Sequence, residues 1–304
     1  MRQGTQLLAF GEEAVARAAD LVHEGQPVAV PTETVYGLAA DATAGAAVAR
    51  VYAAKGRPSF NPLIVHVSDL AAAERYGLFG AAARRLAEAH WPGPLTLVVP
   101  LRKGSGIAGL VTAGLDTVAL RMPAHRAIRA VLKASGRPLA APSANASGRI
   151  SPTRAEHVLA TLDGRIPLVI DDGPTTVGIE STIVAALPGA PLRLLRAGPV
   201  DLALALDESG PVEAPGQLAS HYAPTKPLRL DALTAAADEV HLGFGAVAGD
   251  ETLSRTGDLV EAAARLFDAL HRADAAPRAR IAVAPIPRVG LGIAINDRLR
   301  RAAA

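Results

Sequence analysis

The sequence has no cysteine among its 304 residues. This absence excludes disulfide bonds, thiolate nucleophiles and zinc held by cysteine, and it fits a reducing compartment. No apolar run reaches the roughly 18 residues of a membrane-spanning helix, and the N-terminal stretch MRQGTQLLAFGEEAV lacks the apolar segment of a signal peptide. We therefore expect a soluble cytoplasmic protein in which any metal ion has oxygen or imidazole ligands.

Net charge and aromatic content are also low. The formal net charge is +2 and aromatic residues make up 3% of the chain, whereas a protein that binds nucleic acid along its surface usually has a stronger basic field. Lysine occurs only at Lys55, Lys103, Lys133 and Lys226. The pair of Lys55 and Arg57, separated by one glycine, is therefore less expected than a single arginine.

Familiar catalytic motifs are missing as well. The sequence contains no G-x-x-x-x-G-K-[ST] phosphate loop, no G-x-S-x-G nucleophile motif, and no H-x-x-x-H or H-x-x-E-H zinc spacing. A phosphate group would then have to be bound by scattered side chains and loop amides.

What the sequence does contain is a regular alternation of helix and strand patterns. Strands that alternate with helices and then cluster together indicate a mixed α/β sheet. The segment TETVYG is expected to be a loop, and Thr153 and Glu156 have the spacing of a capping box at a helix start. The expected helices are residues 12–23, 44–56, about 68–90, 125–134, a helix after 153, 258–273 and 292–302, and the expected strands are 27–31, 63–67, 96–100, 117–123, 138–142, 167–173, 181–187, 192–198, 227–232, 240–245 and 281–287.

The alternation breaks down between residues 203 and 227, where prolines and glycines replace any clear period. A segment this long without regular structure is often functional. We assign residues 1–205 to a first α/β domain, residues 206–227 to a linker, and residues 228–304 to a small α/β domain.

Lys55, Arg57 and Asn61 form the best candidate site for an anion. A helix that ends near Gly56 places both cations at its C-terminus, where the helix dipole favours positive charge. Arginine offers a planar fork to phosphate or carboxylate, lysine a compact charge, and Asn61 an amide from the same loop. A solvated helix end has the same composition, so the pattern alone leaves both interpretations open.

Three further residues lie where a buried polar site could form. His66 is inside the apolar run LIVHV and, by strand alternation, shares a face with Ile64. Arg121 ends an apolar strand, a place where arginine usually has a carboxylate or phosphate partner. Thr34 lies in TETVYG. An ordinary core histidine and ordinary turn chemistry remain alternatives for His66 and Thr34.

Two polar loops add candidates. The loop APSANASG supplies Ser143, Asn145 and Ser147 between a strand and a helix, where amides and hydroxyls can bind phosphate. Ser181 stands in GIEST just before a strand, and Arg196 ends LRLLR. A polar turn without a ligand is an equally good interpretation of this spacing.

Taken together, these segments are more specific than any one of them. PTETVYGLAADA, K-x-R-P followed by NPLIVHV, WPGPLTLVV, VALRMP, APSANASG, IESTIV and LLRAG occur in one order along residues 31–198. This set closely resembles the YrdC-like family, and the linker APGQLASHYAP with a C-terminal domain is similar to the two-domain threonylcarbamoyl-AMP synthases. The resemblance implies a YrdC-like twisted mixed sheet with flanking helices, followed by a small Rossmann-like α/β domain.

The resemblance also implies an activity. A nucleotidyltransferase of this kind forms L-threonylcarbamoyl-AMP and pyrophosphate from L-threonine, bicarbonate and ATP. A downstream tRNA threonylcarbamoyl transferase would receive the product and modify the adenosine next to the anticodon. Mg²⁺ is expected on the ATP phosphates, held mainly by the nucleotide and water. Positioning and charge neutralisation carry most such phosphate chemistry, which agrees with the absence of a covalent nucleophile.

Residue roles follow from the resemblance by position. It implies that Lys55 and Arg57 are catalytic and stabilise developing charge, and that Arg121 binds the carboxylate of threonine. The implied ATP-binding residues are Lys55, Arg57, Asn61, Thr117, Ala141, Ser143, Asn145, Ser151, Arg196 and Tyr222, and the implied threonine-binding residues are Thr34, His66, Arg121 and Ser181.

Tyr222 corresponds to a linker tyrosine that folds over the site in two-domain relatives. Some of those relatives read S-P-G-M-K-Y-x-H-Y-A-P, whereas this chain has Ala214 first and Leu218, Ala219 and Ser220 before His221. The aromatic residue and the lysine of that pattern are therefore absent from this linker.

Two rival interpretations stay open. A YrdC-like fold has a concave basic surface and could be a non-catalytic RNA-binding module, although the chain has a near-neutral net charge and lacks basic runs with interleaved aromatics. A related carbamoyl-transfer enzyme would tend to carry a zinc-finger or acylphosphatase segment, and a chain without cysteine cannot form the former. Direct tRNA binding is not decided by the sequence, and no membrane partner is expected.

Overall fold

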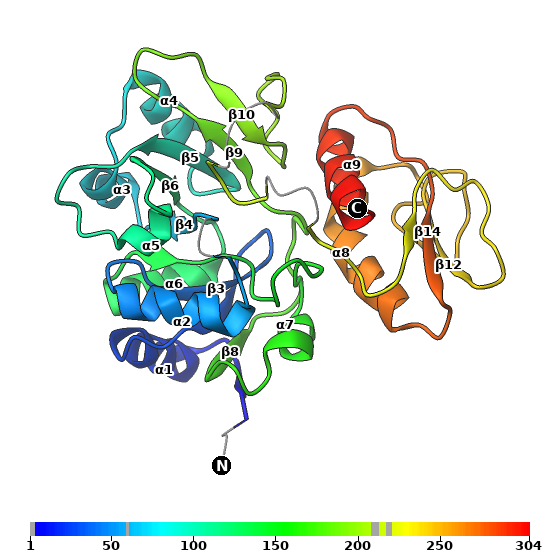
Figure 1. Cartoon of the computed structure of the whole chain (residues 1–304), viewed down its shortest axis with the longest axis horizontal. Helices are drawn as coiled ribbons and strands as arrows, with labels where there is room; N and C mark the ends of the chain where they lie inside the picture. The colour runs from blue at the N-terminus through cyan, green and yellow to red at the C-terminus, as the bar shows by residue number, and fades with distance from the viewer. Residues whose placement is uncertain (1–3, 59–60, 208–212, 217–220) are drawn as a thin grey trace.

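The protein has a large α/β part and a small α/β part that lie side by side (Figure 1). The computed structural model describes residues 4–58, 61–207, 213–216 and 221–304. Within these residues, the structure contains no helix long and apolar enough to cross a membrane.

The large part is built on one ten-stranded mixed sheet with the order β1-β8-β2-β3-β7-β4-β6-β5-β9-β10. β2 and β3 pair in antiparallel orientation, whereas β4 and β6 run parallel and end at the same edge. The predicted mixed sheet is therefore confirmed. Its strands are β1 (Gln6–Ala9), β2 (Val28–Pro31), β3 (Tyr36–Asp41), β4 (Ile64–His66), β5 (Leu95–Pro100), β6 (Thr117–Arg121), β7 (Leu139–Ala140), β8 (Leu168–Asp171), β9 (Thr182–Ala185) and β10 (Arg193–Arg196).

Helices cover both faces of this sheet. On β2, Val28 and Val30 pack with α1 and α6, whereas Ala29 between them packs with α2 and α7 on the opposite face. The predicted flanking helices are thus confirmed. The helices are α1 (Glu12–His23), α2 (Gly45–Lys55), α3 (Leu70–Tyr76), α4 (Ala81–His90), α5 (Gly109–Thr112), α6 (Arg126–Ser135) and α7 (Ala155–Leu162).

The small part is a parallel four-stranded sheet with the order β11-β14-β12-β13, and its two helices lie on the side that faces the large part (Figure 1). One apolar cluster joins Phe267 of α8 and Ile295 of α9 to Ile179 and Tyr222, so the two parts share a core. The elements are β11 (Leu228–Arg229), β12 (Glu239–Gly243), β13 (Glu251–Thr252), α8 (Leu259–Ala275), β14 (Arg280–Val283) and α9 (Leu291–Ala302).

The predicted domain boundaries stay predictions. Of the linker assigned to residues 206–227, residues 208–212 and 217–220 lie outside the described residues, as do residues 1–3 and 59–60. The described linker segments at 213–216 and 221–227 both contact the large part.

The loop predicted for TETVYG is wrong for its last two residues, because β3 begins at Tyr36. All six residues of β3 are buried, since helices cover the sheet on both faces. The strand contains Gly37, Ala39 and Ala40, which are poor strand formers, so its local composition does not indicate a strand.

Two helix predictions also need correction. The helix expected up to residue 90 is divided into α3 and α4, because Gly77 is extended and a Cβ on it would lie 2.5 Å from Val99 Cγ2. The capping box of Thr153 and Glu156 does not form. α7 starts one residue later than that box requires, with Arg154 as N-cap and no side-chain cap hydrogen bond.

Candidate active site

A small polar cavity lies in the large part, where the ends of β4 and β6 meet the loop after β7 and the linker. Its free volume is about 50 Å³. Nine predicted site residues line it, namely Thr34, Arg57, His66, Arg121, Ala141, Ser143, Ser181, Arg196 and Tyr222. Residues that are far apart in the sequence are therefore brought together at one edge of the sheet.

Lys55 lies directly behind one wall of this cavity. It is buried at the end of α2, and its ammonium donates to the backbone oxygen of Ser143, to the backbone oxygen of Asn145 at 2.6 Å and to Asn145 Oδ1 at 3.3 Å. Three acceptors match the three N–H donors of an ammonium group. Burial and the nearby charge of Arg57 lower the pKa of Lys55 well below its usual value. Lys55 thus ties the loop predicted to bind phosphate to α2.

Arg57 enters the cavity because α2 ends on a left-handed glycine. Gly56 has φ 61° and turns the chain out of the helix, as is common at helix C-termini. The Arg57 guanidinium donates to the backbone oxygens of Asn61 at 3.4 Å and Pro62 at 3.1 Å. Asn61 does not line the cavity, and its Oδ1 is buried without a hydrogen-bond partner among the described residues.

Arg121 is the centre of a buried ion pair at the end of β6. Its Nη2 donates to Glu33 Oε1 at 2.6 Å, its Nη1 to Thr34 Oγ1 at 3.1 Å and its Nε to the Gly93 oxygen at 3.2 Å. Burial disfavours the charged Glu33, but the charge and hydrogen bonds of Arg121 outweigh burial and lower the pKa of Glu33. The sequence predicted a carboxylate or phosphate partner for Arg121, and a carboxylate partner, Glu33, is present within the chain.

His66 lies beside Arg121, because β4 and β6 pair in parallel with these two residues in register. Ile64 and His66 both line the cavity, which confirms that they share a face. Burial and the charge of Arg121 lower the pKa of His66 to about 3, so the imidazole is neutral near pH 7. Its Nδ1 is buried and has no hydrogen-bond partner in the described chain.

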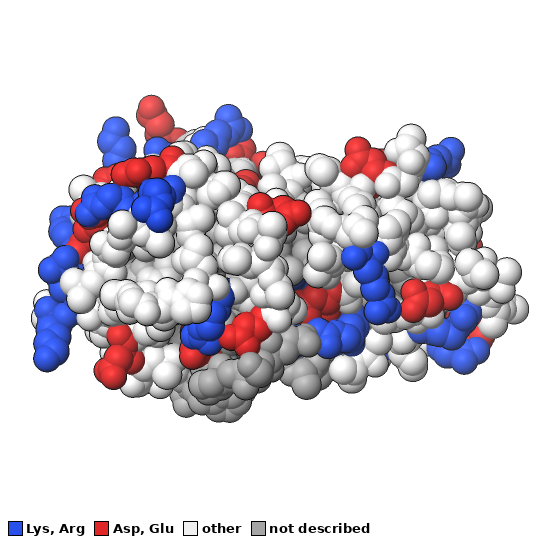
Figure 2. Space-filling model, turned by 90° about the horizontal axis from the view of Figure 1, so that it is seen from above, with Lys and Arg blue, Asp and Glu red and all other residues white. Residues whose placement is uncertain are grey.

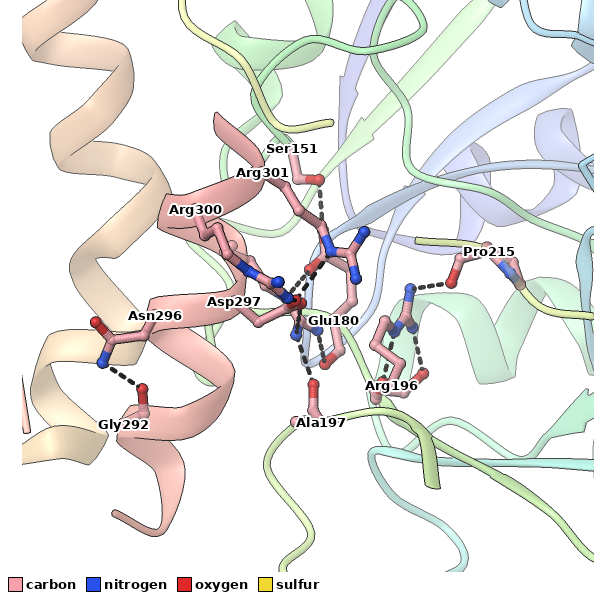
Figure 3. Close-up of polar contacts among 12 residues, drawn as sticks. Ser151, Glu180, Arg196, Ala197, Pro215, Gly292, Asn296, Asp297, Arg300 and Arg301 are labelled. Atoms are coloured by element: carbon pink, nitrogen blue, oxygen red, sulfur yellow. Dashed lines mark hydrogen bonds and ion pairs between the residues drawn. The ribbon is translucent and has the colours of Figure 1, made fainter. Parts of the chain in front are cut away.

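Arg196 fixes the opposite wall. Its guanidinium donates to the backbone oxygen of Ser181 at 2.9 Å, to Ser181 Oγ at 3.0 Å and to the Pro215 oxygen of the linker at 3.3 Å (Figure 3). Ser181 Oγ also lies 2.8 Å from Thr96 Oγ1. One arginine therefore connects β10, the segment before β9 and the linker.

The linker closes the cavity. Pro215, Gly216, His221 and Tyr222 all line it, and Tyr222 is 1% exposed. The hydroxyl of Tyr222 has no hydrogen-bond partner among the described residues. Gly216 packs so closely that a Cβ on it would lie 2.9 Å from this hydroxyl.

Glu180 connects the cavity to the small part. One carboxylate oxygen accepts from Ser151 Oγ at 2.5 Å, and the other accepts from Arg298 Nε of α9 at 3.1 Å. Asp297 of α9 contacts the same guanidinium, since Arg298 Nη1 donates to Asp297 Oδ2 at 3.3 Å. Arg298 is fully buried and also donates to the Ala197 oxygen at 2.5 Å.

Arg298 was missed by the sequence reasoning, although a signal exists. It stands four residues after Ala294 and four before Ala302, on the buried face of α9. A charged residue on the apolar face of a helix usually has a buried partner. That partner lies far away in the sequence, which is why the residue looked like its neighbours Arg300 and Arg301.

Five predicted site residues do not line the cavity. Lys55 and Asn145 lie behind Ser143 and are hydrogen-bonded to each other. Ser151 does not reach the cavity but donates to Glu180, which lines it. Asn61 accepts a hydrogen bond from Arg57 with its backbone oxygen. Thr117 lies at the start of β6, at the other end of the strand from Arg121.

The described residues do not offer a ready metal site. Within them, no group of three or more His, Asp and Glu side chains could hold a metal ion. The two carboxylates beside the cavity, Glu33 and Glu180, are held by Arg121 and Arg298.

Comparison with known proteins gives matches over nearly the whole chain. The family model described as Telomere recombination (Sua5_yciO_yrdC) matches residues 20–198, and the model described as Threonylcarbamoyl-AMP synthase, C-terminal domain, matches residues 182–304. The threonylcarbamoyl-AMP synthase of Bacillus subtilis is 40% identical and aligns over 98% of this chain and 95% of its own.

Solved structures agree with these matches. The crystal structure of Pyrococcus abyssi Sua5 complexed with L-threonine has a TM-score of 0.89, 35% identity and coverage of 98% of both chains. Escherichia coli YciO, at 19% identity and a TM-score of 0.58, covers 65% of this chain and 98% of its own and shares the fold.

The fold and the matches together define the class of the protein, which is a two-domain α/β transferase of the Sua5/YrdC type. More narrowly, the chain belongs to the threonylcarbamoyl-AMP synthase family. The resemblance seen in the sequence motifs is thereby confirmed.

Proposed function

We propose that this chain forms L-threonylcarbamoyl-AMP and pyrophosphate from L-threonine, bicarbonate and ATP. The observation that carries the proposal is the charge around the cavity. Arg57, Arg121 and Arg196 line it, Lys55 lies behind it, and all four are buried. Among the described residues, only Arg121 of these four forms an ion pair, with Glu33.

Buried positive charge without a counter-charge is costly, so such a site favours a ligand with several negative charges. The triphosphate of ATP and the carboxylate of threonine provide them. The relationship of the chain to threonylcarbamoyl-AMP synthases supports this pair of substrates.

The proposed reaction has two steps. The amine of threonine adds to bicarbonate with loss of water to give a carbamate. A carbamate oxygen then attacks the α-phosphorus of ATP, the bond to the β-phosphate oxygen breaks, and pyrophosphate leaves. The protein positions the reactants and stabilises the charge of the transition state, and no covalent nucleophile is needed.

Threonine is placed at the end of the cavity formed by Arg121, His66, Thr34 and Ser181. Arg121 uses three of its donors within the chain, which leaves part of its fork for the threonine carboxylate. The unpartnered Nδ1 of the neutral His66 can form one hydrogen bond to the substrate. Support for this end of the site comes from the relative that was solved as a complex with L-threonine.

The phosphates of ATP are placed toward Lys55, Arg57 and Arg196. We assign to Lys55 and Arg57 the stabilisation of charge as pyrophosphate leaves, and Mg²⁺ would arrive as part of the nucleotide substrate. Asn61, Thr117, Ala141, Ser143, Asn145, Ser151 and Tyr222 remain the predicted nucleotide contacts.

ATP binding requires the linker to move. The cavity of about 50 Å³ is far below the roughly 300–1,000 Å³ of ordinary small-molecule sites. Pro215, Gly216, His221 and Tyr222 take up the remaining space. We infer that the linker opens to admit substrates and packs over them during the reaction.

The small domain is given a positioning role. Arg298 neutralises Glu180, which neighbours Ser181 and binds Ser151. Glu180 would otherwise be a buried carboxylate beside the incoming phosphates. We infer that α9 neutralises this negative charge beside the nucleotide.

The product is a mixed anhydride, so a transferase that moves its threonylcarbamoyl group to tRNA must consume it. This places the activity in the cytoplasm with the tRNA. Neither direct tRNA binding nor a docking surface for that transferase is part of the proposal.

The test is pyrophosphate release from ATP by the full chain. We expect release only when both threonine and bicarbonate are present. Equal release with serine would contradict the proposed pocket. No release with any amino acid would leave the non-catalytic RNA-binding module as the better interpretation.

A further inference from the structure

A second cleft lies on the large part, away from the cavity described above. It is bounded by the segment after β4, by α3, by α6 and by the turn before β7, and its volume is about 560 Å³. It shares no lining residue with the candidate active site. The proposed reaction therefore gives this cleft no role.

The rim of the cleft is strongly basic. Arg75, Arg129, Lys133 and Arg137 line it, and Asp69 is the single carboxylate among its described lining residues. Both oxygens of Asp69 are already used, since Oδ1 accepts from the Ala72 amide at 2.7 Å and Oδ2 from Ser68 Oγ at 2.9 Å. Asp69 thus caps α3 and lies near Arg75, so its single negative charge offsets only part of the four positive charges of the rim.

Three of these four cations have no ion-pair partner among the described residues. Arg75, Arg129 and Lys133 form no ion pair there, and Arg137 has only a long contact of 3.7 Å from its Nε to Asp41 Oδ2. In Figure 2, Lys and Arg side chains lie along the end of the molecule that α3 forms in Figure 1, with Asp and Glu side chains among them. Positive charge concentrated in a concave surface attracts anions.

Arg129 gives the most specific indication. Its Nη1 is buried and has no hydrogen-bond partner among the described residues. A buried donor of a charged group that lacks an acceptor is costly, and a guanidinium fork matches phosphate geometry. The position favours an anion that enters the cleft and accepts from Arg129.

The walls indicate the size and type of the anion. Val67, Ala72, Leu132 and Pro138 supply apolar surface, and Tyr76 supplies an aromatic ring. A cleft of about 560 Å³ is in the range of small-molecule sites, and a base can stack on an aromatic side chain. We propose that this cleft is a second anion site, which binds a nucleoside phosphate through its basic rim and apolar walls.

The test is equilibrium dialysis of the full chain with labelled ADP and, separately, with labelled pyrophosphate. We expect the wild-type chain to bind one more equivalent of ADP than an Arg129→Gln, Lys133→Gln double variant. A matched Arg84→Gln, Arg85→Gln variant, with two exposed arginines of α4 replaced, should bind ADP as the wild type does.

Pyrophosphate release by the double variant at the wild-type rate would show that its fold and its active site are intact, so the two proposals can fail separately. Lys133→Glu alone, at an exposed position, keeps the test available if the double variant does not fold.

The proposal is overturned if the wild type and the double variant bind the same number of ADP molecules. It is also overturned if the cleft binds pyrophosphate but not ADP, or if the double variant loses affinity for tRNA and keeps its affinity for ADP. In either case the ligand of the cleft would not be a nucleoside phosphate.

Discussion

The hydrogen bonds of Lys55 give the clearest structural support for the proposed chemistry. A buried ammonium with three acceptors from one loop is held still, and its charge lies just behind Ser143. The geometry is that of a preorganised charge, which costs no rearrangement when negative charge develops nearby.

We predict that Lys55→Met lowers the turnover number by about 10²–10³-fold, the usual effect of removing one preorganised donor. Lys103→Met, which makes the same chemical change at an exposed position, should leave turnover unchanged. The measurement is the rate of pyrophosphate release at saturating substrates, with circular dichroism to show that the fold is kept. Near-normal turnover in Lys55→Met would show that this residue is structural.

At this scale the sequence could predict residues that break a local pattern. Arg121 at the end of an apolar strand and His66 inside one stood out, and both line the cavity. Glu33 and Arg298 could not be assigned partners, because the atoms they meet belong to segments 88 and 118 residues away.

At the scale of elements, most helices were predicted because their apolar residues repeat at helical spacing, and most strands because they are short apolar runs. The short elements β1, α5 and β13 were not predicted, and neither were β3 and the break between α3 and α4. β3 is rich in glycine and alanine, and the break depends on close packing of Gly77 against β5. The linker is the element with the most direct bearing on function.

We predict that Gly216→Ala loosens the docked linker. Gly216 has φ 90°, and a methyl group on it would lie 3.0 Å from Arg196 Cδ as well as close to Tyr222. Limited proteolysis of the ligand-free protein should cut this variant faster within residues 206–227. The control is Gly189→Ala, because Gly189 also has a positive φ of 74° but has no atom within 4 Å of the added carbon.

Both variants carry the backbone strain of alanine in the left-handed region, about 1–2 kcal/mol. Only Gly216→Ala also brings a methyl group too close to Arg196 and Tyr222. Equal rates of cleavage for Gly216→Ala and Gly189→Ala would therefore refute tight docking of Gly216. Cleavage of the wild type that is unchanged by ATP and threonine would count against a linker that closes over the substrates.

At the scale of the whole molecule, α9 joins the small domain to the cavity wall through Arg298. We predict that Arg298→Met destabilises the protein by about 3–5 kcal/mol, because it leaves the Glu180 carboxylate buried without its cation. Adding Glu180→Gln should recover most of this loss. Arg300→Met, on the same helix with its side chain 58% exposed, is the control.

The measurement is the free energy of unfolding in urea for the two single variants, the double variant and the control. If the double variant is no more stable than Arg298→Met, the ion pair does not connect the domains in the way proposed.

Protonation of buried histidines should also lower the stability of the whole protein at acid pH. Burial lowers the pKa of His66 and of His221 to about 3, well below the roughly 6.5 of an unfolded chain. Above pH 6.5 the two histidines are neutral in both the folded and the unfolded state, so their burial does not reduce stability. As the pH falls below 6.5, the unfolded state takes up protons that the folded state does not, so stability falls.

The slope is about 1.4 kcal/mol per pH unit for each such histidine. We therefore predict a lower free energy of unfolding at pH 5 than at pH 7, measured by urea denaturation. His66→Gln should reduce the difference. Equal stability at the two pH values would contradict buried neutral imidazoles.

The identity of the adenylate product tests the central claim most directly. The full chain is incubated with ATP, threonine and carbon-labelled bicarbonate, and the adenylate is analysed by mass spectrometry. We predict a product that contains AMP, threonine and the labelled carbon. An unlabelled threonyl adenylate, or pyrophosphate release without a product that contains the label, would contradict it.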